Sequence, residues 1–236
     1  MSNDIGRNID EINSQISQSC LITGRNVQSV QLLAVSKTKP ISSLLTAYGA
    51  GQRAFGENYL QEALEKITEL PKDIEWHFIG SIQSKKIKQI AQNFKWIHTL
   101  DRTKVVDKLV EYAQTNTIEG IQVCLQVNID NESTKSGFNL TENKTELLES
   151  IAKLQNAKGV SLRGLMCIPN PEINSEGDSF KRLKSLLDEL NDQLGLKMDT
   201  LSMGMSNDMH QAILAGSTIV RVGTAIFGQR NYQATN

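Results

Sequence analysis

The first residues of the chain carry isoleucine at a helical spacing. Ile5, Ile9, Ile12 and Ile16 follow one another at intervals of four, three and four residues. This spacing places them on one face of an α-helix, with polar residues between them. We therefore expect an amphipathic N-terminal helix that packs against a core.

Beyond this helix, short apolar runs alternate with longer polar stretches of helical periodicity. Several of the short runs are apolar throughout, which is typical of strands that are covered on both faces. The expected strands are 31–37, 53–58, 75–82, 96–101, 121–128, 161–168, 200–205 and 219–228. The expected helices between them are 40–50, 58–70, 83–93, 102–116, 141–155, 178–194 and 207–215.

This alternation predicts an α/β fold with a parallel sheet, either open and doubly wound or closed into a barrel. The first strand-to-helix turn, VSKTKP at 35–40, contains no GxGxxG fingerprint, which disfavours a dinucleotide-binding sheet. Eight units in 236 residues fit a (β/α)8 TIM-type barrel with an extra N-terminal helix. No stretch looks like a linker, so we expect a single domain over 1–236.

Charge and composition exclude several functional classes. Lys plus Arg number 25 and Asp plus Glu 26, so the formal net charge is -1 and no basic footprint for nucleic acid or an anionic membrane is expected. No apolar run approaches the ~20 residues of a membrane span, and the N-terminus lacks a signal-peptide core. We therefore predict a cytoplasmic protein.

Cysteine and histidine spacing gives no sign of a metal site. Cys20, Cys124 and Cys167 are far apart, and the three histidines show no ligand spacing. We expect the thiols to be small apolar fillers rather than nucleophiles. Lysines 85, 86 and 88 could form an anion patch, but a solvated helix face is the commoner role of such a run.

Candidate chemistry gathers where the expected strands end. Lys37 follows the first strand, either as an amine that forms a Schiff base or as a solvated strand-end lysine. Ser206 stands at the expected start of helix 207–215, where a helix N-terminus can bind an anion. Gly223 and Thr224 add a close backbone approach and a hydroxyl. The pattern predicts a phosphate site, although a plain N-cap and a packing glycine would also explain it.

Arg221 lies inside an otherwise apolar strand, so its guanidinium needs a partner, either a carboxylate or a ligand. A lysine amine, an arginine and a phosphate site together suggest pyridoxal phosphate (PLP), whose ring nitrogen an arginine can face. Because arginine keeps its proton, that ring nitrogen would stay an unprotonated acceptor and the ring a weaker electron sink.

Seven ordered blocks of the chain carry a family resemblance. The chain resembles the pyridoxal phosphate homeostasis proteins, which are similar to the N-terminal barrel of alanine racemase. The blocks cover nearly the whole chain: LLAVSKTKP (32–40), FGENYLQEA (55–63), WHFIGSIQSKK (76–86), ESTKSGF (132–138), RGLMCIP (163–169), SMGMSNDMHQAI (202–213) and RVGTAIFG (221–228).

The resemblance implies a PLP site at the barrel mouth. It implies that Lys37 holds PLP as a covalent aldimine, that Arg221 faces the ring nitrogen and that Asn58 lines the pocket, with His77 and Met166 as further lining candidates. The phosphate contacts that it implies come from Ser206, Asn207, Gly223 and Thr224.

The resemblance leaves open whether the protein is an enzyme. Alanine racemase takes a second acid/base, a tyrosine, from a C-terminal β domain across a dimer. This sequence ends soon after its last expected strand, and its four tyrosines lie in expected helices or the tail. We therefore expect a monomeric PLP carrier or buffer without robust turnover, which serves vitamin B6 and amino-acid homeostasis and delivers PLP to apo-enzymes. A slow PLP-dependent amino-acid racemase and a Schiff-base aldolase acting on a phosphorylated substrate are the alternatives.

Overall fold

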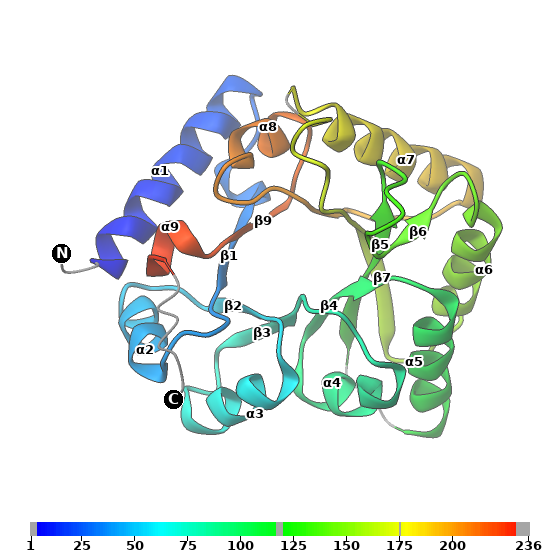
Figure 1. Ribbon diagram of the computed structural model, residues 1–236, viewed down its shortest axis with the longest axis horizontal. Coiled ribbons are helices and arrows are strands. Elements are labelled where there is room, and N and C mark those ends of the chain that lie inside the picture. The colour runs from blue at the N-terminus through cyan, green and yellow to red at the C-terminus, as the bar shows by residue number, and fades with distance from the viewer. Residues whose placement is uncertain (1–3, 117–119, 175, 230–236) are drawn as a thin grey trace.

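Eight parallel strands close into a barrel that helices surround (Figure 1). The computed structural model describes residues 4–116, 120–174 and 176–229. The barrel strands are β1 (Gln31–Val35), β2 (Ala54–Glu57), β3 (Glu75–Phe78), β4 (Trp96–Leu100), β5 (Ile121–Asn128), β7 (Val160–Met166), β8 (Thr200–Ser202) and β9 (Ile219–Val222). Their order is β4-β3-β2-β1-β9-β8-β7-β5, and a β4–β5 pairing closes the ring. The expected (β/α)8 barrel is confirmed.

The helices form an outer ring. They are α1 (Ile5–Ile22), α2 (Ile41–Gly49), α3 (Leu60–Glu69), α4 (Ile87–Asn93), α5 (Thr103–Thr115), α6 (Lys144–Gln155), α7 (Asp178–Leu194), α8 (Met209–Leu214) and α9 (Thr224–Phe227). Two 3₁₀ turns, η1 (Val27–Ser29) and η2 (Ser84–Lys86), complete the set. Among the described residues, no helix is long and apolar enough to cross a membrane.

The isoleucine stripe explains where α1 lies. All four isoleucines of the stripe are buried. The helix packs along α8, α2 and α9, on the side of the barrel where β1 pairs with β9 (Figure 1). Asp4 caps the helix, because its carboxylate accepts a hydrogen bond of 3.1 Å from the Arg7 N–H. The extra N-terminal helix thus covers the β1–β9 side of the barrel.

The apolar core has two parts. The larger part fills the space between the barrel and its helices. A much smaller cluster lies apart from it and consists of Leu33, Ala54, Trp96, Cys124, Met166 and Ile219. Inward-facing strand residues fill the interior of a barrel of this size. In this barrel, the small apolar cluster and buried polar side chains fill the interior together.

The structure differs from the expected elements at several places. The strands expected over 31–37, 75–82 and 200–205 end earlier, at Val35, Phe78 and Ser202. The expected strand 219–228 ends at Val222, because the Gly223 carbonyl accepts hydrogen bonds of 3.0 and 2.9 Å from the Ile226 and Phe227 N–H groups and begins α9. The two-residue strand β6 (Phe138–Asn139), which pairs with β5, is too short to show a periodicity in the sequence. The helix expected over 207–215 begins only at Met209.

The β7–β8 contact predicts the effect of one added methyl group. A Cβ at Gly164 would collide with the Thr200 carbonyl oxygen on β8. We expect Gly164→Ala to lower the free energy of unfolding by about 1–3 kcal/mol, as overpacking does. Urea denaturation measures this. Gly49→Ala is the control, because nothing lies within 4 Å of its added Cβ, and a change no larger than the control's would contradict the prediction.

Candidate functional site

The seven predicted site residues lie at the C-terminal ends of four strands that are consecutive around the barrel. Asn58 follows β2, Lys37 follows β1, Arg221 with Gly223 and Thr224 marks the end of β9, and Ser206 with Asn207 follows β8. Since the sheet order is β2-β1-β9-β8, these strand ends adjoin at one side of the barrel mouth.

Strand register brings these ends close together. Val35 pairs with Gly56 on one side, and Ala34 pairs with Val222 on the other. A Cβ added at Gly223 would lie 3.2 Å from the Val35 carbonyl oxygen, a tight contact that a glycine avoids where the β9 end approaches β1. The short approach brings the phosphate candidates next to the lysine candidate.

Lys37 is half-buried and lies in a turn whose geometry is held from α3. The next residue, Thr38, has φ 60, a left-handed conformation that a β-branched residue adopts only under constraint. The Thr38 N–H donates a hydrogen bond of 2.6 Å to the Glu62 carboxylate. The strained turn therefore places Lys37 at the mouth through a contact with a neighbouring helix.

Beneath this turn lies a buried ionic cluster. The Lys66 ammonium, whose side chain is 4% exposed, lies 2.7 Å from Glu57 Oε1 and 2.6 Å from Glu62 Oε1. It also donates 2.8 Å to the Ser36 carbonyl oxygen, while the Ser36 hydroxyl donates 2.7 Å to Glu57. All three ammonium protons are thus used, and the cluster ties the ends of β1 and β2 to α3.

Burial dominates the ionisation of this cluster's innermost acid. The Glu57 side chain is fully buried, and desolvation raises its pKa above the ordinary value, although Lys66 opposes the shift. Its second oxygen, Oε2, has no hydrogen-bond partner among the described residues. The ammonium of Lys66 is therefore what makes this buried carboxylate tolerable.

The strand-eight loop does not form the expected serine cap. Helix α8 begins at Met209 with Asp208 as its N-cap residue, so Ser206 lies in the preceding turn rather than at the helix start. The Asp208 carboxylate accepts 2.6 Å from the Met205 N–H and folds this turn. Ser206 and Asn207 are exposed at the mouth, where their polar groups can meet a ligand.

The strand-nine loop presents a short helix to the mouth. Thr224 is the first residue of α9, and N–H groups in the first turn of a helix have no partner within the helix. At its other end, the Lys39 ammonium donates 3.1 Å to the Phe227 carbonyl and 3.0 Å to the Gly228 carbonyl. The helix is therefore capped by a cation at the end that faces away from Thr224.

Arg221 is buried without a carboxylate partner among the described residues. One guanidinium nitrogen donates 2.8 Å to the Ser202 hydroxyl, and the other donates 2.9 Å to the Cys167 carbonyl. Burial lowers the pKa of the guanidinium, and it raises the pKa of the Cys167 thiol to about 12. Cys167 is therefore a filler here, and the Arg221 guanidinium is held by neutral hydrogen-bond acceptors.

His77 and Met166 lie inside the barrel and are fully buried. Both nitrogens of His77 are engaged, Nδ1 with His98 at 2.9 Å and Nε2 with Glu75 at 2.9 Å. In this arrangement His77 has no nitrogen left for a ligand.

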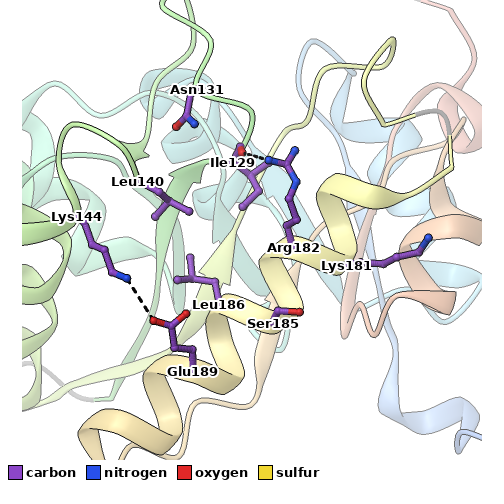
Figure 2. Close-up of a pocket in the computed structure, with 9 residues that line it drawn as sticks. All are labelled: Ile129, Asn131, Leu140, Lys144, Lys181, Arg182, Ser185, Leu186 and Glu189. Atoms are coloured by element: carbon purple, nitrogen blue, oxygen red, sulfur yellow. Dashed lines mark hydrogen bonds and ion pairs between the residues drawn. The ribbon is translucent and has the colours of Figure 1, made fainter.

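Other surface features carry no predicted site residue. A cavity of about 390 Å³ opens between α6 and α7 (Figure 2). Its charged groups are already paired, Lys144 with Glu189 at 3.3 Å and Arg182 with the Ile129 carbonyl at 2.9 Å. In the described part of the chain, no group of three or more His, Cys, Asp or Glu side chains could hold a metal ion.

The remaining sequence candidates lie on the surface. Lys85 and Lys88 are exposed, and Lys88 lies over the Tyr112 ring at 6.0 Å. Of the tyrosines, Tyr59 is exposed directly after Asn58, and Tyr232 lies outside the described residues.

Comparisons with known proteins agree with this geometry. A family model described as the N-terminal domain of alanine racemase matches residues 13–231. The pyridoxal phosphate homeostasis protein of Haemophilus influenzae is 45% identical over 238 residues, which cover 98% of each chain. That of Vibrio alginolyticus is 48% identical over 235 residues, covering 97% of this chain and 98% of the relative. The chain belongs to the pyridoxal phosphate homeostasis protein family.

Two solved structures are similar in fold to this chain. PipY of Synechococcus elongatus, solved with PLP bound, is 34% identical with a TM-score of 0.80, covering 95% of this chain and 100% of that one. Alanine racemase of Clostridium difficile has a TM-score of 0.73 at 14% identity, covering 98% of this chain and 61% of that one, a likeness of fold alone.

The Lys66 cluster predicts a large loss of stability when its cation is removed. Lys66→Met leaves Glu57 and Glu62 without their counter-ion, and breaking a buried pair costs about 3–5 kcal/mol. Urea denaturation measures this, with the exposed Lys88→Met as the matched control. Adding Glu57→Gln to Lys66→Met is expected to recover part of the loss, and no recovery would contradict the charge argument.

The buried histidines predict a loss of stability in acid. Desolvation lowers the pKa of both His77 and His98, that of His98 well below the ordinary value. As pH falls through about 6.5, the histidines of the unfolded chain bind protons that those of the folded chain do not bind. The free energy of unfolding therefore declines by up to about 1.4 kcal/mol per pH unit per histidine.

Urea denaturation at a series of pH values between 7.5 and 5.5 measures this slope. His98→Gln is expected to flatten it. An equal slope in wild type and His98→Gln would contradict the prediction.

Proposed function

We propose that this protein binds PLP at the barrel mouth and serves vitamin B6 homeostasis as a carrier or buffer of the cofactor. The observation that carries the proposal is the convergence of Lys37, Arg221 and the Gly223–Thr224 turn at adjoining strand ends. An amine, a buried cation and backbone donors for a phosphate are the groups that PLP needs. The two relatives of 45% and 48% identity are named pyridoxal phosphate homeostasis protein, which supports a role in PLP homeostasis.

The residues present fit this cofactor. Asn58 Oδ1 is buried and has no hydrogen-bond partner among the described residues, which is costly unless a ligand or water satisfies it. Gly223 allows the backbone of the β9 end to come close to a bound group. Arg221 spends two of its five N–H groups on Ser202 and Cys167, so it keeps donors for a ligand.

Each residue has a proposed task. Lys37 Nζ bonds covalently to the aldehyde carbon of PLP with loss of water, and Arg221 donates a hydrogen bond to the ring nitrogen. The phosphate is held by Ser206, by the Asn207 N–H, and by Gly223 and Thr224. When bound, PLP supplies an aldehyde that reacts reversibly with amines.

A carrier role follows from which groups the chain provides. Arg221 keeps the ring nitrogen an unprotonated acceptor, which weakens the electron sink that racemisation needs. Release then requires only that an incoming amine displace Lys37 and that the phosphate leave exposed turns. We propose that apo-enzymes that use PLP are the acceptors, and that the carrier acts as a cytosolic monomer.

The lysine assignment is tested on the purified protein. We expect a visible absorption band that borohydride bleaches, with a pyridoxyl adduct mapped to Lys37 by peptide mass spectrometry. Lys37→Ala is expected to lose the adduct and keep weaker, phosphate-anchored binding that denaturation releases. Lys88→Ala is the control and is expected to behave like wild type.

A colourless protein that takes up no added PLP would overturn the proposal and favour the phosphorylated-substrate aldolase. Exchange of an amino acid's α-hydrogen in deuterated solvent separates carrier from racemase. We expect exchange no faster than with free PLP, and exchange well above that rate would favour the racemase.

A further inference from the structure

A continuous chain of polar side chains crosses the barrel interior from its floor to Arg221. Glu75 at the start of β3 lies 2.9 Å from His77 Nε2, and His77 Nδ1 lies 2.9 Å from His98 Nε2. His98 Nδ1 lies 2.7 Å from the Ser202 hydroxyl, which lies 2.8 Å from Arg221. Four of these five side chains are buried, and Glu75 at the floor is half-exposed.

The two side chains at the ends of this hydrogen-bonded series, Glu75 and Arg221, determine the direction of every hydrogen bond in it. Arginine can only donate, and an ionised carboxylate can only accept. Glu75 therefore accepts a hydrogen bond from the Nε2–H of His77. This leaves Nδ1 of neutral His77 to accept a hydrogen bond from the Nε2–H of His98. Nδ1 of neutral His98 then accepts the hydroxyl proton of Ser202, whose oxygen accepts from Arg221.

Between the two ends, His77, His98 and the Ser202 hydroxyl each donate one hydrogen bond and accept one, whereas Glu75 Oε1 accepts a second hydrogen bond, of 3.1 Å, from Gln31. A proton added to His98 Nδ1 would remove the acceptor for the Ser202 hydroxyl and would put a second cation near Arg221. Desolvation favours the neutral form of both imidazoles and lowers the pKa of each. The Trp96 ring stacks on the His77 imidazole, with an interplanar angle of 5° and a distance of 5.5 Å between the ring centroids, and restrains that imidazole further.

We infer that Glu75, His77, His98 and Ser202 are positioning residues that orient Arg221 toward a ligand's ring nitrogen through a one-way hydrogen-bond relay. The ligand in this inference rests on the proposed function, whereas the order of the relay rests on the geometry alone. Its task is to hold two guanidinium nitrogens against the Ser202 hydroxyl and the Cys167 carbonyl, which leaves the other N–H donors for a ligand.

The first test needs no PLP. Nitrogen-15 NMR of the imidazoles in the protein without cofactor is expected to show His77 and His98 neutral, each protonated on Nε2 alone. Glu75→Gln replaces the obligate acceptor by an amide that can also donate, so we expect mixed tautomers at both histidines. The imidazole nitrogen signals of the exposed His210, which lies outside the relay, serve as a reference in the same spectrum. Protonation of either buried histidine on Nδ1 in wild type would overturn the inference.

The second test uses PLP and a matched pair of buried serines. Ser202→Ala is expected to shift the absorption maximum of the loaded protein and to weaken PLP retention about tenfold, the loss of one hydrogen bond to a charged group. Ser202→Thr, which keeps the hydroxyl, is expected to restore both. Ser217→Ala removes an equally buried hydroxyl that bonds only backbone carbonyls, so it tests a purely structural effect.

If Ser217→Ala shifted the spectrum as much as Ser202→Ala, the positioning role would be overturned. If wild-type protein took up no PLP, the proposed function would fail, and the NMR experiment would still decide the relay.

Discussion

The placement of the lysine candidate depends on one buried ammonium group. Lys66 reaches from α3 under the barrel mouth and contacts Glu57, Glu62 and the Ser36 carbonyl at once. Without this cation, the fully buried Glu57 carboxylate would lie close to that of the partly exposed Glu62 with no counter-ion, and desolvation would disfavour its charge. The same contacts fix the end of β1, so the residue that makes the interior tolerable also determines where Lys37 stands.

The mouth thus has two polar supports with opposite electrostatic character. Beneath Lys37 lies the ionic cluster, in which one cation meets two acids. Beneath Arg221 lies a chain of neutral groups, and its only full negative charge is Glu75 on the barrel floor. An ionic support neutralises the charges that it brings together, whereas the neutral groups that contact Arg221 leave the guanidinium without a carboxylate in hydrogen-bond contact.

The sequence was sufficient to predict the parts that depend on periodicity. The isoleucine stripe of α1 and the alternation of apolar and polar stretches predict the barrel, since both patterns record burial directly. Arg221 could be singled out because a charge inside an apolar strand needs a partner. Glu57 carries the same signal, and Glu62 and Lys66 stand four residues apart on an expected helix, but neither pattern reveals that the three side chains meet.

The parts that could not be predicted depend on long-range contacts. His98 and Ser202 are 104 residues apart in the chain and join only because β4 and β8 face each other across the barrel. Ser206 looks like a helix cap in the sequence, yet the Asp208 carboxylate accepts from Met205 and delays the helix start to Met209. Asp208 occupies the N-cap position without a side-chain capping hydrogen bond, and local spacing alone does not reveal that its carboxylate turns back to Met205.

The geometry of the mouth is also consistent with release. The groups proposed to hold the phosphate are short and lie on exposed turns, whereas the groups proposed to hold the ring are buried and supported from below. Under the proposed function, this arrangement would leave the phosphate end accessible to water. A carrier needs such access, because a fully enclosed phosphate would retain PLP even after an amine had displaced the lysine.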